Sequence, residues 1–137
     1  MMIAYHVNEP LAVDEFVALL RASTLGERRP VDDLAVMEDM LRHANLLATA
    51  RADGRLVGVA RTLTDFAYIA YMSDLAVDVS FQRRGIGKGL IRATRRQLGP
   101  QCRLLLVAAP AAESYYSHIG FEHLPRAYLL PADRDVR

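Results

Sequence analysis

The chain has 137 residues, of which 52% are hydrophobic, and it carries a formal net charge of +1 at pH 7. This length predicts a single domain over residues 1–137. The near-neutral charge argues against a dedicated DNA-binding domain, which usually carries a strong excess of basic residues. Because no secretory signal pattern or membrane-length apolar run is visible, and the one cysteine, Cys102, suits a reducing compartment, we expect a cytoplasmic protein without nucleic-acid or membrane partners.

The first part of the chain predicts one strand followed by two helices. Residues 2–7 form the strand, and Asn8 with Pro10 predicts a helix start with Asn8 as its N-cap. This helix ends near Ser23, and residues 24–30 form a loop. The second helix is indicated by apolar residues at offsets of three and four, which are Leu34, Met37, Leu41 and Ala44.

Three strands are predicted next. Residues 46–51 and 56–63 flank Asp53-Gly54, a pair typical of the type I′ turn in a two-residue hairpin. A longer strand is predicted over residues 68–79. We therefore expect a β-hairpin followed by a third strand that is longer than the first two.

The last part of the chain mixes helices and strands. Residues 85–98 predict a helix stopped by the Gly-Pro pair behind them, and the nearly continuous apolar run 102–108 predicts a buried strand. Pro110 begins a short helix that ends at Gly120, and one or two closing strands are expected after it, around residues 128–130. The order βααβββαβαβ predicts an α+β fold around one mixed sheet.

The most informative stretch joins the third of these strands to the helix behind it, and it reads Gln82-Arg83-Arg84-Gly85-Ile86-Gly87-Lys88-Gly89. Glycine costs roughly 1 kcal/mol in a helix relative to alanine, so three glycines at a helix start need a reason. Without side chains, the first backbone N–H groups are bare, carry the positive end of the helix dipole and can bind a phosphate. The neighbouring cations strengthen this prediction of a pyrophosphate-binding turn, although an ordinary tight turn is the alternative.

Two better-known phosphate loops do not fit this stretch. In the P-loop a Ser or Thr follows the lysine, whereas here Gly89 follows Lys88, and Leu90 occupies the third glycine position of the Rossmann pattern. The pattern that remains, Gln82-x-x-Gly85-x-Gly87, resembles the pyrophosphate signature of the GNAT superfamily of N-acetyltransferases.

The resemblance to the GNAT superfamily extends over residues 46–123. Residues 112–121 match its second motif, A-x-x-[LF]-Y-x-x-x-G-F, although Ala109 stands where many members carry a cofactor-binding asparagine. The resemblance implies a mixed, mostly antiparallel central sheet flanked by helices. It also implies acetyl-CoA as cofactor, held by Leu75, Ala76, Val77, Gln82, Arg83, Arg84, Gly85, Ile86, Gly87, Lys88 and Gly89.

The same resemblance implies a direct transfer of the acetyl group to an amine of a small molecule or peptide. Tyr116 corresponds to the tyrosine that serves family members as general acid, and a phenol with a pKa near 10 is still protonated at neutral pH. Helical spacing alone leaves Tyr115 as an alternative. A non-catalytic acyl-CoA-binding module that regulates a partner is a second candidate function, because the phosphate-binding turn serves both.

Asp74 is the candidate for the group that takes the amine proton. It stands in an otherwise apolar strand, and an unpaired buried carboxylate is costly, so it needs a role or a partner. In many family members an acid in this strand serves as base, and a salt bridge to Arg61 on the neighbouring strand is an equal alternative. Arg61 and Asp65 are candidates for the amine site, or they are solvated.

Three further features have plainer interpretations. The basic stripe of Lys88, Arg92, Arg95 and Arg96 is best explained as a solvated helix face. The four histidines show no metal-ligand spacing, so no metal site is expected. The apolar residues 128–131 could supply a sheet edge to a second copy of the chain, which predicts a homodimer.

Overall fold

Five strands form one mixed sheet in the computed structural model, which describes residues 2–137. Neighbouring strands pair antiparallel from the first to the fourth, and the fourth pairs parallel with the fifth. The α+β fold with a mixed, mostly antiparallel sheet is therefore confirmed. In chain order, which is also their order in the sheet, the strands are β1 (Ile3–Val7), β2 (Leu46–Ala52), β3 (Arg55–Thr64), β4 (Ile69–Val77) and β5 (Arg103–Leu106).

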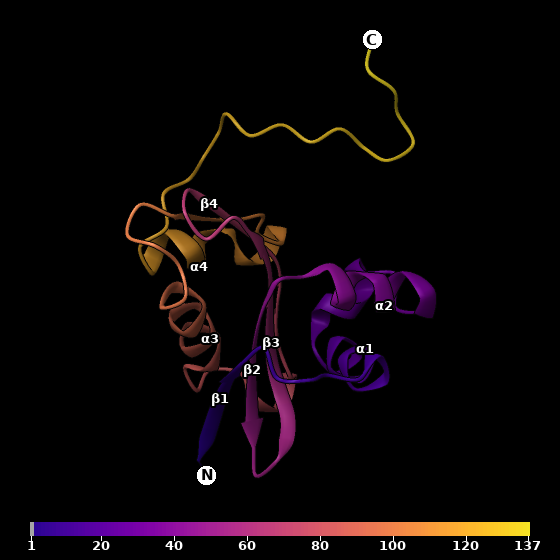
Figure 1. The fold of residues 1–137 in the computed structure, drawn as a ribbon, viewed down its shortest axis with the longest axis vertical. Coiled ribbons are helices and arrows are strands. Elements are labelled where there is room, and N and C mark those ends of the chain that lie inside the picture. The colour runs from indigo at the N-terminus through magenta and orange to yellow at the C-terminus, as the bar shows by residue number, and fades with distance from the viewer. Residues whose placement is uncertain (1) are drawn as a thin grey trace. The chain divides into compact units, whose positions relative to one another are not determined.

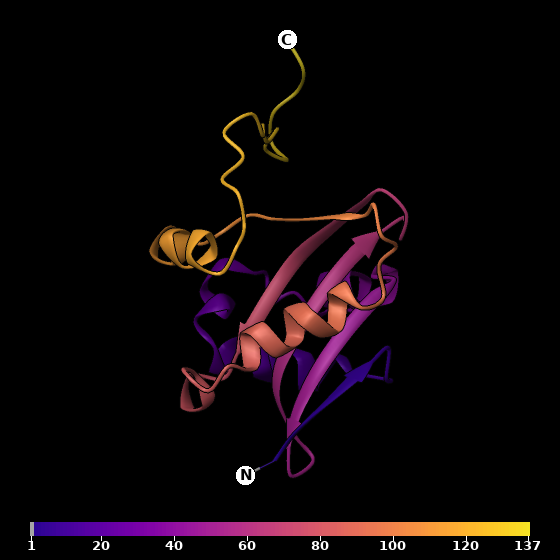
Figure 2. The ribbon, with the colours of Figure 1, turned by 90° about the vertical axis from the view of Figure 1, so that its left-hand side faces the viewer.

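The chain forms two compact units, one ending at Val107 and one beginning at Ala108. The first unit contains the sheet and three helices, and the second contains the short helix α4 (Glu113–His118) after a 3-10 turn, η3 (Pro110–Ala112). Figure 1 shows two helices of the first unit on one face of the sheet, and Figure 2 shows the third crossing the other face. They are α1 (Val13–Ala22), α2 (Leu34–His43) and α3 (Ile86–Arg95).

The main hydrophobic core lies between the sheet and the pair α1 and α2. The buried side chains of α1 pack against apolar residues of three neighbouring strands, and burial of each such side chain contributes about 1.5–3 kcal/mol. The residues involved are Phe16, Val17, Leu19 and Leu20 of α1, Val31 before α2, Met37 of α2, and Leu47, Leu56, Val59 and Ala76 of the strands.

The opposite sheet face is built from small residues that let α3 approach closely. Ala50 lies opposite Gly58, and a Cβ added to Gly58 would lie 2.9 Å from the Cδ1 atom of Leu90. The paired residues Ala48 and Ala60 continue this small surface and are fully buried. The sheet therefore holds α3 firmly, and with it the turn at the start of that helix.

The hairpin between β2 and β3 has the predicted turn. Asp53 and Gly54 have φ values of +49° and +85°, and a type I′ turn requires positive φ at both positions. The strand over residues 2–7, both long helices of the first half, and the helix start at Gly85 are likewise confirmed.

The predicted role of Asn8 is wrong. Helix α1 begins at Val13, and Asn8 lies before it with a φ of +57°. Its side-chain Oδ1 accepts the backbone N–H of Leu47 at 2.8 Å, and its own N–H donates to the Leu47 carbonyl at 2.7 Å. Asn8 therefore joins the end of β1 to the start of β2, because its amide side chain can pair with a strand as well as with a helix.

Several elements are shorter than predicted. The strand over 68–79 ends at Val77, because the Asp78 side chain accepts the N–H of Ser80 and begins a 3-10 turn, η2 (Val79–Phe81). The helix over 85–98 ends at Arg95, and the strand over 102–108 ends at Leu106. The loop over 24–30 contains the 3-10 turn η1 (Thr24–Arg28).

The closing strands are the largest error in the fold prediction. Residues 121–137 of the second unit contain no strand. Proline lacks the N–H that a ladder needs, and Pro125 and Pro131 stand on either side of the apolar segment. Turns close beside each proline, where Ala127 donates to Leu124 and Arg134 donates to the Pro131 carbonyl.

Candidate functional site

Helix α3 begins on a turn without covering side chains. Gly85 is the N-cap and has a φ of +79°, a left-handed conformation that glycine adopts without strain. The first N–H groups of a helix have no partner within it, and no side chain caps them here. Apart from the adjoining residues and the backbone of the helix itself, no atom lies within 4 Å of the position that a Cβ would take on Gly85 or Gly87. The first turn of α3 is therefore neither capped by a side chain nor covered by another residue at these two glycines.

Cationic side chains surround this turn. Arg83, Arg84 and Lys88 are exposed, and the guanidinium carbon of Arg84 lies 5.2 Å from the centroid of the Phe81 ring. Gln82 donates from Nε2 to the carbonyl oxygen of Val77 at 3.2 Å, which ties the turn to the end of β4. Positive side chains and the positive end of the helix dipole thus act on the same space.

Gly89 has a different use from the other two glycines. Its N–H already donates to the Gly85 carbonyl at 3.0 Å, as in any helix. A Cβ at this position would collide with the hydroxyl and ring of Tyr5 on β1. The missing side chain of Gly89 therefore makes room for β1 to pack against α3.

Strand β4 continues beyond its parallel partner. The pairing with β5 runs from Ile69 opposite Arg103 to Met72 opposite Leu106, whereas β4 extends to Val77. Within residues 2–107, no strand pairs with the far edge of residues 73–77. Backbone N–H and C=O groups on an unpaired edge can bind an extended ligand. This edge includes Leu75, Ala76 and Val77, and it leads to the turn of α3.

The open edge begins at a β-bulge. The pairing of β3 with β4 jumps from Arg61 opposite Asp74 to Thr62 opposite Met72, so Ser73 is the extra residue. The bulge therefore marks the point at which β4 and β5 part.

Two arginines hold the buried carboxylate next to this bulge. The Asp74 side chain is completely buried, and its Oδ2 atom forms an ion pair with Nε of Arg61. This is the salt bridge that the sequence offered as one alternative. A second guanidinium, from Arg29 at the end of η1, donates from Nε to Oδ1 of Asp74 at 2.6 Å. The sequence did not indicate Arg29, because no pattern marks a loop arginine 45 residues away.

Asp65 closes the turn between β3 and β4. Its Oδ1 atom accepts the backbone N–H groups of Tyr68, Ile69 and Ala67 at 2.8, 3.1 and 2.9 Å. These three hydrogen bonds, the one from Tyr68 foremost, lower the pKa of Asp65 below its ordinary value. The carboxylate thus has a local structural partner in addition to any role toward a ligand.

In the second unit, the end of α4 fixes the position of Tyr116. The N–H of Phe121 donates to the Tyr116 carbonyl at 2.9 Å, and the N–H of Gly120 donates to Ser117 at 3.3 Å. Gly120 has a φ of +110°, and this combination is a Schellman motif. The rings of Tyr116 and Phe121 meet edge to face with centroids 5.5 Å apart.

The two adjacent tyrosines therefore differ in environment. Tyr115 is 41% exposed, whereas Tyr116 is half-buried. Burial, with a smaller effect from Tyr115, raises the pKa of Tyr116 above its ordinary value. The Tyr116 hydroxyl consequently keeps its proton at neutral and mildly alkaline pH.

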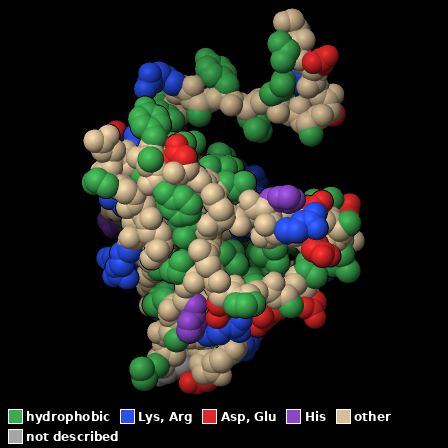
Figure 3. Space-filling model, in the orientation of Figure 1, with side chains coloured by type: hydrophobic (Ala, Val, Ile, Leu, Met, Phe, Trp, Pro, Cys, Tyr) green, Lys and Arg blue, Asp and Glu red, His purple; other side chains and the backbone are tan. Residues whose placement is uncertain are grey.

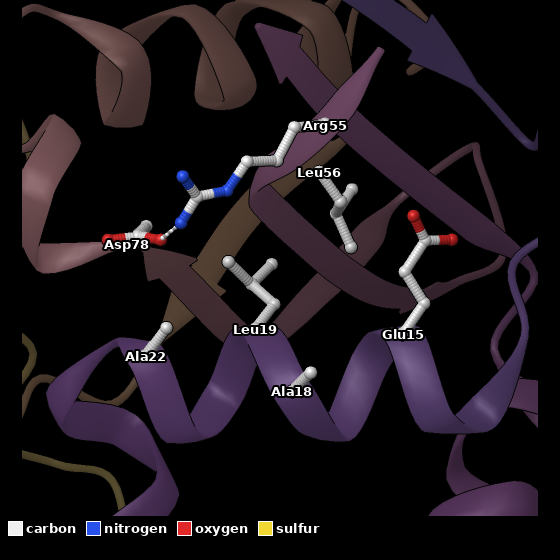
Figure 4. A pocket seen from close by; sticks show the side chains of 7 residues that line it. All are labelled: Glu15, Ala18, Leu19, Ala22, Arg55, Leu56 and Asp78. Atoms are coloured by element: carbon white, nitrogen blue, oxygen red, sulfur yellow. Dashed lines mark hydrogen bonds and ion pairs between the residues drawn. The ribbon is translucent and has the colours of Figure 1, made fainter.

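A hollow of about 230 Å³ lies between α1 and the start of β3 (Figure 4). Its floor is apolar, and its charged lining groups are already engaged: Arg55 pairs with Asp78 at 2.8 Å, and Glu15 pairs with Arg51 at 2.8 Å. Because the charged residues that line the hollow already form ion pairs, none is left to bind a ligand, and we assign the hollow no function. The lining residues are Glu15, Ala18, Leu19, Ala22, Arg55, Leu56 and Asp78.

In the view of Figure 3, the charged side chains over α1 and α2 do not form one large patch of a single sign. Lys and Arg side chains there lie among Asp and Glu side chains. Within residues 2–137, no helix is long and apolar enough to cross a membrane.

Comparison with known proteins gives consistent results. Residues 24–128 match the model of a family described as the acetyltransferase (GNAT) domain. The histone acetyltransferase TAP1 of Glycine max is 32% identical over 108 residues, which cover 72% of this chain and 47% of that protein. The chain thus spans about half the length of TAP1 and of the probable acetyltransferase TAP2 of the same plant.

Solved structures of similar fold include two named as acetyltransferases. A GNAT family acetyltransferase from Streptococcus pneumoniae superposes with a TM-score of 0.78 at 23% identity, covering 98% of this chain and all of that one. The aminoglycoside N-acetyltransferase AAC(6')-Iy, solved in complex with CoA, has a TM-score of 0.74 at 22% identity, covering 97% of this chain and 96% of that one. These likenesses concern the fold, and the family model covers most of the chain. The chain belongs to the GNAT acetyltransferase family.

Proposed function

We propose that residues 1–137 act as one acetyltransferase domain that transfers an acetyl group from acetyl-CoA to a primary amine of a small molecule or peptide. The observation that carries this proposal is the uncovered first turn of α3, which continues from the open edge of β4. The names of similar proteins support it, since one is a histone acetyltransferase and another an aminoglycoside N-acetyltransferase in complex with CoA.

The start of α3 suits a pyrophosphate in shape and charge. The N–H groups of Ile86, Gly87 and Lys88 lie in the uncapped first turn, and a Cβ on Gly87 would fill open space in front of it. Helix N-termini of this kind bind phosphate through their amides and their dipole. We propose that the side chains of Arg83, Arg84 and Lys88 contribute the matching positive charge, while Gln82 holds the turn to β4.

The open edge of β4 suits the rest of the cofactor. From Val77 back to Ser73 the strand measures about 13 Å, at about 3.3 Å per residue. An amide-containing arm that starts at the α3 turn can therefore pair with Leu75, Ala76 and Val77 and end near the bulge. We propose this edge as the pantetheine-binding surface.

When bound, acetyl-CoA supplies a thioester whose carbonyl carbon can accept an amine. A backbone N–H of the open β4 edge is suited to donate to the carbonyl oxygen, where charge develops. The Tyr116 hydroxyl is suited to hold a proton at its Oη atom for the departing sulfur, because its raised pKa keeps it protonated. Its half-buried ring, fixed against Phe121, favours Tyr116 over Tyr115 for this role.

Asp74 is a poor candidate for direct proton transfer in this conformation. Both of its carboxylate oxygens face guanidinium groups, and the side chain has no exposed surface, so an amine would have to displace Arg29 or Arg61 to reach it. We propose that Asp74 instead holds the bulge, and that the amine proton leaves through solvent or a group outside this cluster.

The engagement of Asp74 also favours a second candidate, a domain that binds acyl-CoA and regulates a partner without catalysis. The two are separated by incubating the protein with acetyl-CoA and a panel of amines, and following thiol release and product mass. Acetyl transfer to any amine above the uncatalysed rate supports the enzyme. CoA binding with no transfer to any member of the panel supports the regulatory module.

We further propose that the chain forms a homodimer. The apolar residues Tyr128, Leu129 and Leu130 are large and exposed in the second unit. Contiguous exposed apolar side chains of this kind are typical of contact surfaces between proteins.

A further inference from the structure

The ion-pair cluster at the bulge contains more positive than negative charge. Arg29 and Arg61 both bind Asp74, and Arg29 also donates from Nη2 to the Ser73 carbonyl at 2.7 Å. Arg61 donates from Nη2 to the Ser73 hydroxyl at 3.0 Å. Within residues 2–107, no second carboxylate lies within 4 Å of either guanidinium. Two cations and one anion leave a surplus of one positive charge.

The surplus charge is accessible from solvent only at one side chain. The side chains of Asp74 and Arg61 are 0% and 7% exposed, whereas that of Arg29 is 23% exposed. Charge at a partly buried position is only partly screened by salt. Arg29 is therefore the group through which a ligand would meet the positive charge of the cluster.

Arg29 also has N–H donors that are not used in hydrogen bonds within residues 2–107. A guanidinium has five N–H donors, and the recorded bonds of Arg29 are one from Nε, one from Nη1 to the Arg28 carbonyl and one from Nη2. Two N–H groups on the terminal nitrogens are left, within residues 2–107. Such N–H groups can form charge-assisted hydrogen bonds with a carboxylate.

The position of Arg29 connects this charge to the proposed reaction. Its Nη2 atom binds Ser73, the bulge residue at which the open edge of β4 begins. The acyl end of a ligand lying along that edge from the α3 turn would reach this bulge. An acceptor amine attacking there would lie beside the guanidinium of Arg29.

Resting on the proposed function, we propose that Arg29 is a specificity-determining residue that binds a carboxylate of the acceptor. The substrate class is then an amine that also carries a carboxylate a few bonds from the reacting nitrogen, as amino acids and small peptides do. Polyamines are disfavoured, because their additional positive charge meets the surplus charge of the cluster.

The first test compares acceptors with the unmodified protein. A panel of amino acids is assayed against the same compounds as carboxamides, with a linear polyamine as the cationic reference. We expect the carboxylates to exceed their carboxamides in kcat/KM by about 10- to 100-fold, mainly through KM, as one charge-assisted contact allows. Equal rates within each pair, or preference for the polyamine, would overturn the proposal without any variant.

The second test removes the guanidinium. Arg29→Gln should abolish the preference for carboxylates and leave CoA affinity unchanged, while Arg29→Lys should retain part of it. Arg21→Gln is the matched control, because Arg21 has an exposed ion pair with Asp32 in the same region and its loss changes the net charge equally. A uniform loss for both members of each pair in Arg29→Gln would make Arg29 merely structural and overturn the assignment.

The outcomes also separate this proposal from the proposed function. Absence of CoA binding and of transfer to every acceptor would refute the acetyltransferase activity. Transfer without any dependence on acceptor charge would refute only the role of Arg29.

Discussion

Tyr116 is the residue on which the proposed chemistry depends most directly. Its ring is fixed against Phe121 by the Schellman motif at the end of α4, and burial raises its pKa. A fixed, protonated phenol has the two properties that a general acid needs: a defined direction and a proton to give.

Tyr116→Phe should slow acetyl transfer by roughly 10²–10⁴-fold, because it keeps the ring and removes the proton. CoA affinity should change little, as calorimetry can show. The pH profile provides a second readout. Since the pKa of Tyr116 is raised, the Tyr116-dependent part of the rate should persist up to its ordinary value near 10 and fall only above it.

The control for this substitution is Tyr115→Phe, which removes a neighbouring and more exposed hydroxyl. It should retain nearly full turnover. The general-acid role would pass to Tyr115 if the two variants behaved in the opposite way, and it would be lost if both kept full turnover.

The pH dependence of stability tests whether the Asp65 carboxylate stabilises the turn between β3 and β4. Its folded-state pKa is lowered by three backbone N–H donors, so it stabilises the fold above its unfolded pKa of about 3.9. That stabilisation is lost as the pH falls through the folded-state pKa. Asp65→Ala should therefore lower Tm at pH 7, and the difference from the unmodified chain should shrink below about pH 4.

Asp39→Ala is the matched control for Asp65, because Asp39 is an exposed carboxylate whose partner is Arg42 on the same helix. Its effect on Tm should be small. A difference between Asp65→Ala and the unmodified chain that did not vary with pH would contradict the charge-based explanation.

Side-chain contacts could be predicted from the sequence only where the two residues lie on adjacent strands. The Arg61–Asp74 pair was one of two alternatives because the residues lie on adjacent strands. Arg29 could not be predicted, because only the packing of η1 against β4 brings it to Asp74. Asn8 was misassigned because an asparagine side chain caps helices and pairs with strands equally well.

Helix α3 illustrates how glycines in one element serve different purposes. Gly85 has a positive φ, Gly87 faces open space, and Gly89 faces Tyr5. Their spacing in the sequence correctly predicted the helix start, but the contact with β1 could not be seen, because it joins residues that are far apart in the chain.

Gly89→Ala should destabilise the fold by up to about 2 kcal/mol, because the new methyl group would collide with the ring of Tyr5 and an overpacking cost of about 1–3 kcal/mol is offset by about 1 kcal/mol of better helix propensity. Gly87→Ala, at the second residue of α3, should be neutral or stabilise the fold by up to about 1 kcal/mol, since alanine is the better helix former and has room there. Urea denaturation measures both changes.

The collision itself is tested by a double variant. Gly89→Ala combined with Tyr5→Ala should cost less than the sum of the two single substitutions. Strict additivity would show that Tyr5 does not contact this position.

Turns and strands were predicted correctly where a few neighbouring residues determine them. The hairpin turn at Asp53 and Gly54 is encoded in two residues and was confirmed. The closing strands were wrong, since apolar composition does not create a strand where prolines limit the segment to five residues, 126–130.

The whole molecule brings together features that belong to the family and features of this chain. The mixed, mostly antiparallel sheet was anticipated from the GNAT resemblance, although the predicted order contained at least one closing strand more than the five strands observed. The surplus charge at the bulge was not anticipated, because it depends on the length and path of the segment between α1 and α2.

At this scale we expect the purified chain to form a homodimer. Light scattering at micromolar concentration should give twice the mass of 15.3 kDa. Replacement of Leu129 and Leu130 by serine should reduce the mass to that of one chain, because it removes the exposed apolar surface. A monomeric mass for the unmodified chain would contradict the dimer and leave the single-chain site as described.

The proposed function depends above all on the binding of the CoA pyrophosphate by the first turn of α3. Calorimetry with CoA tests it most directly, using the unmodified chain, Gly87→Glu and the conservative Gly87→Ala. We predict binding to the unmodified chain and to Gly87→Ala, and no detectable binding to Gly87→Glu, whose carboxylate would occupy the open space and repel the phosphates. Unchanged CoA affinity in a folded Gly87→Glu variant would show that the pyrophosphate does not bind at this turn.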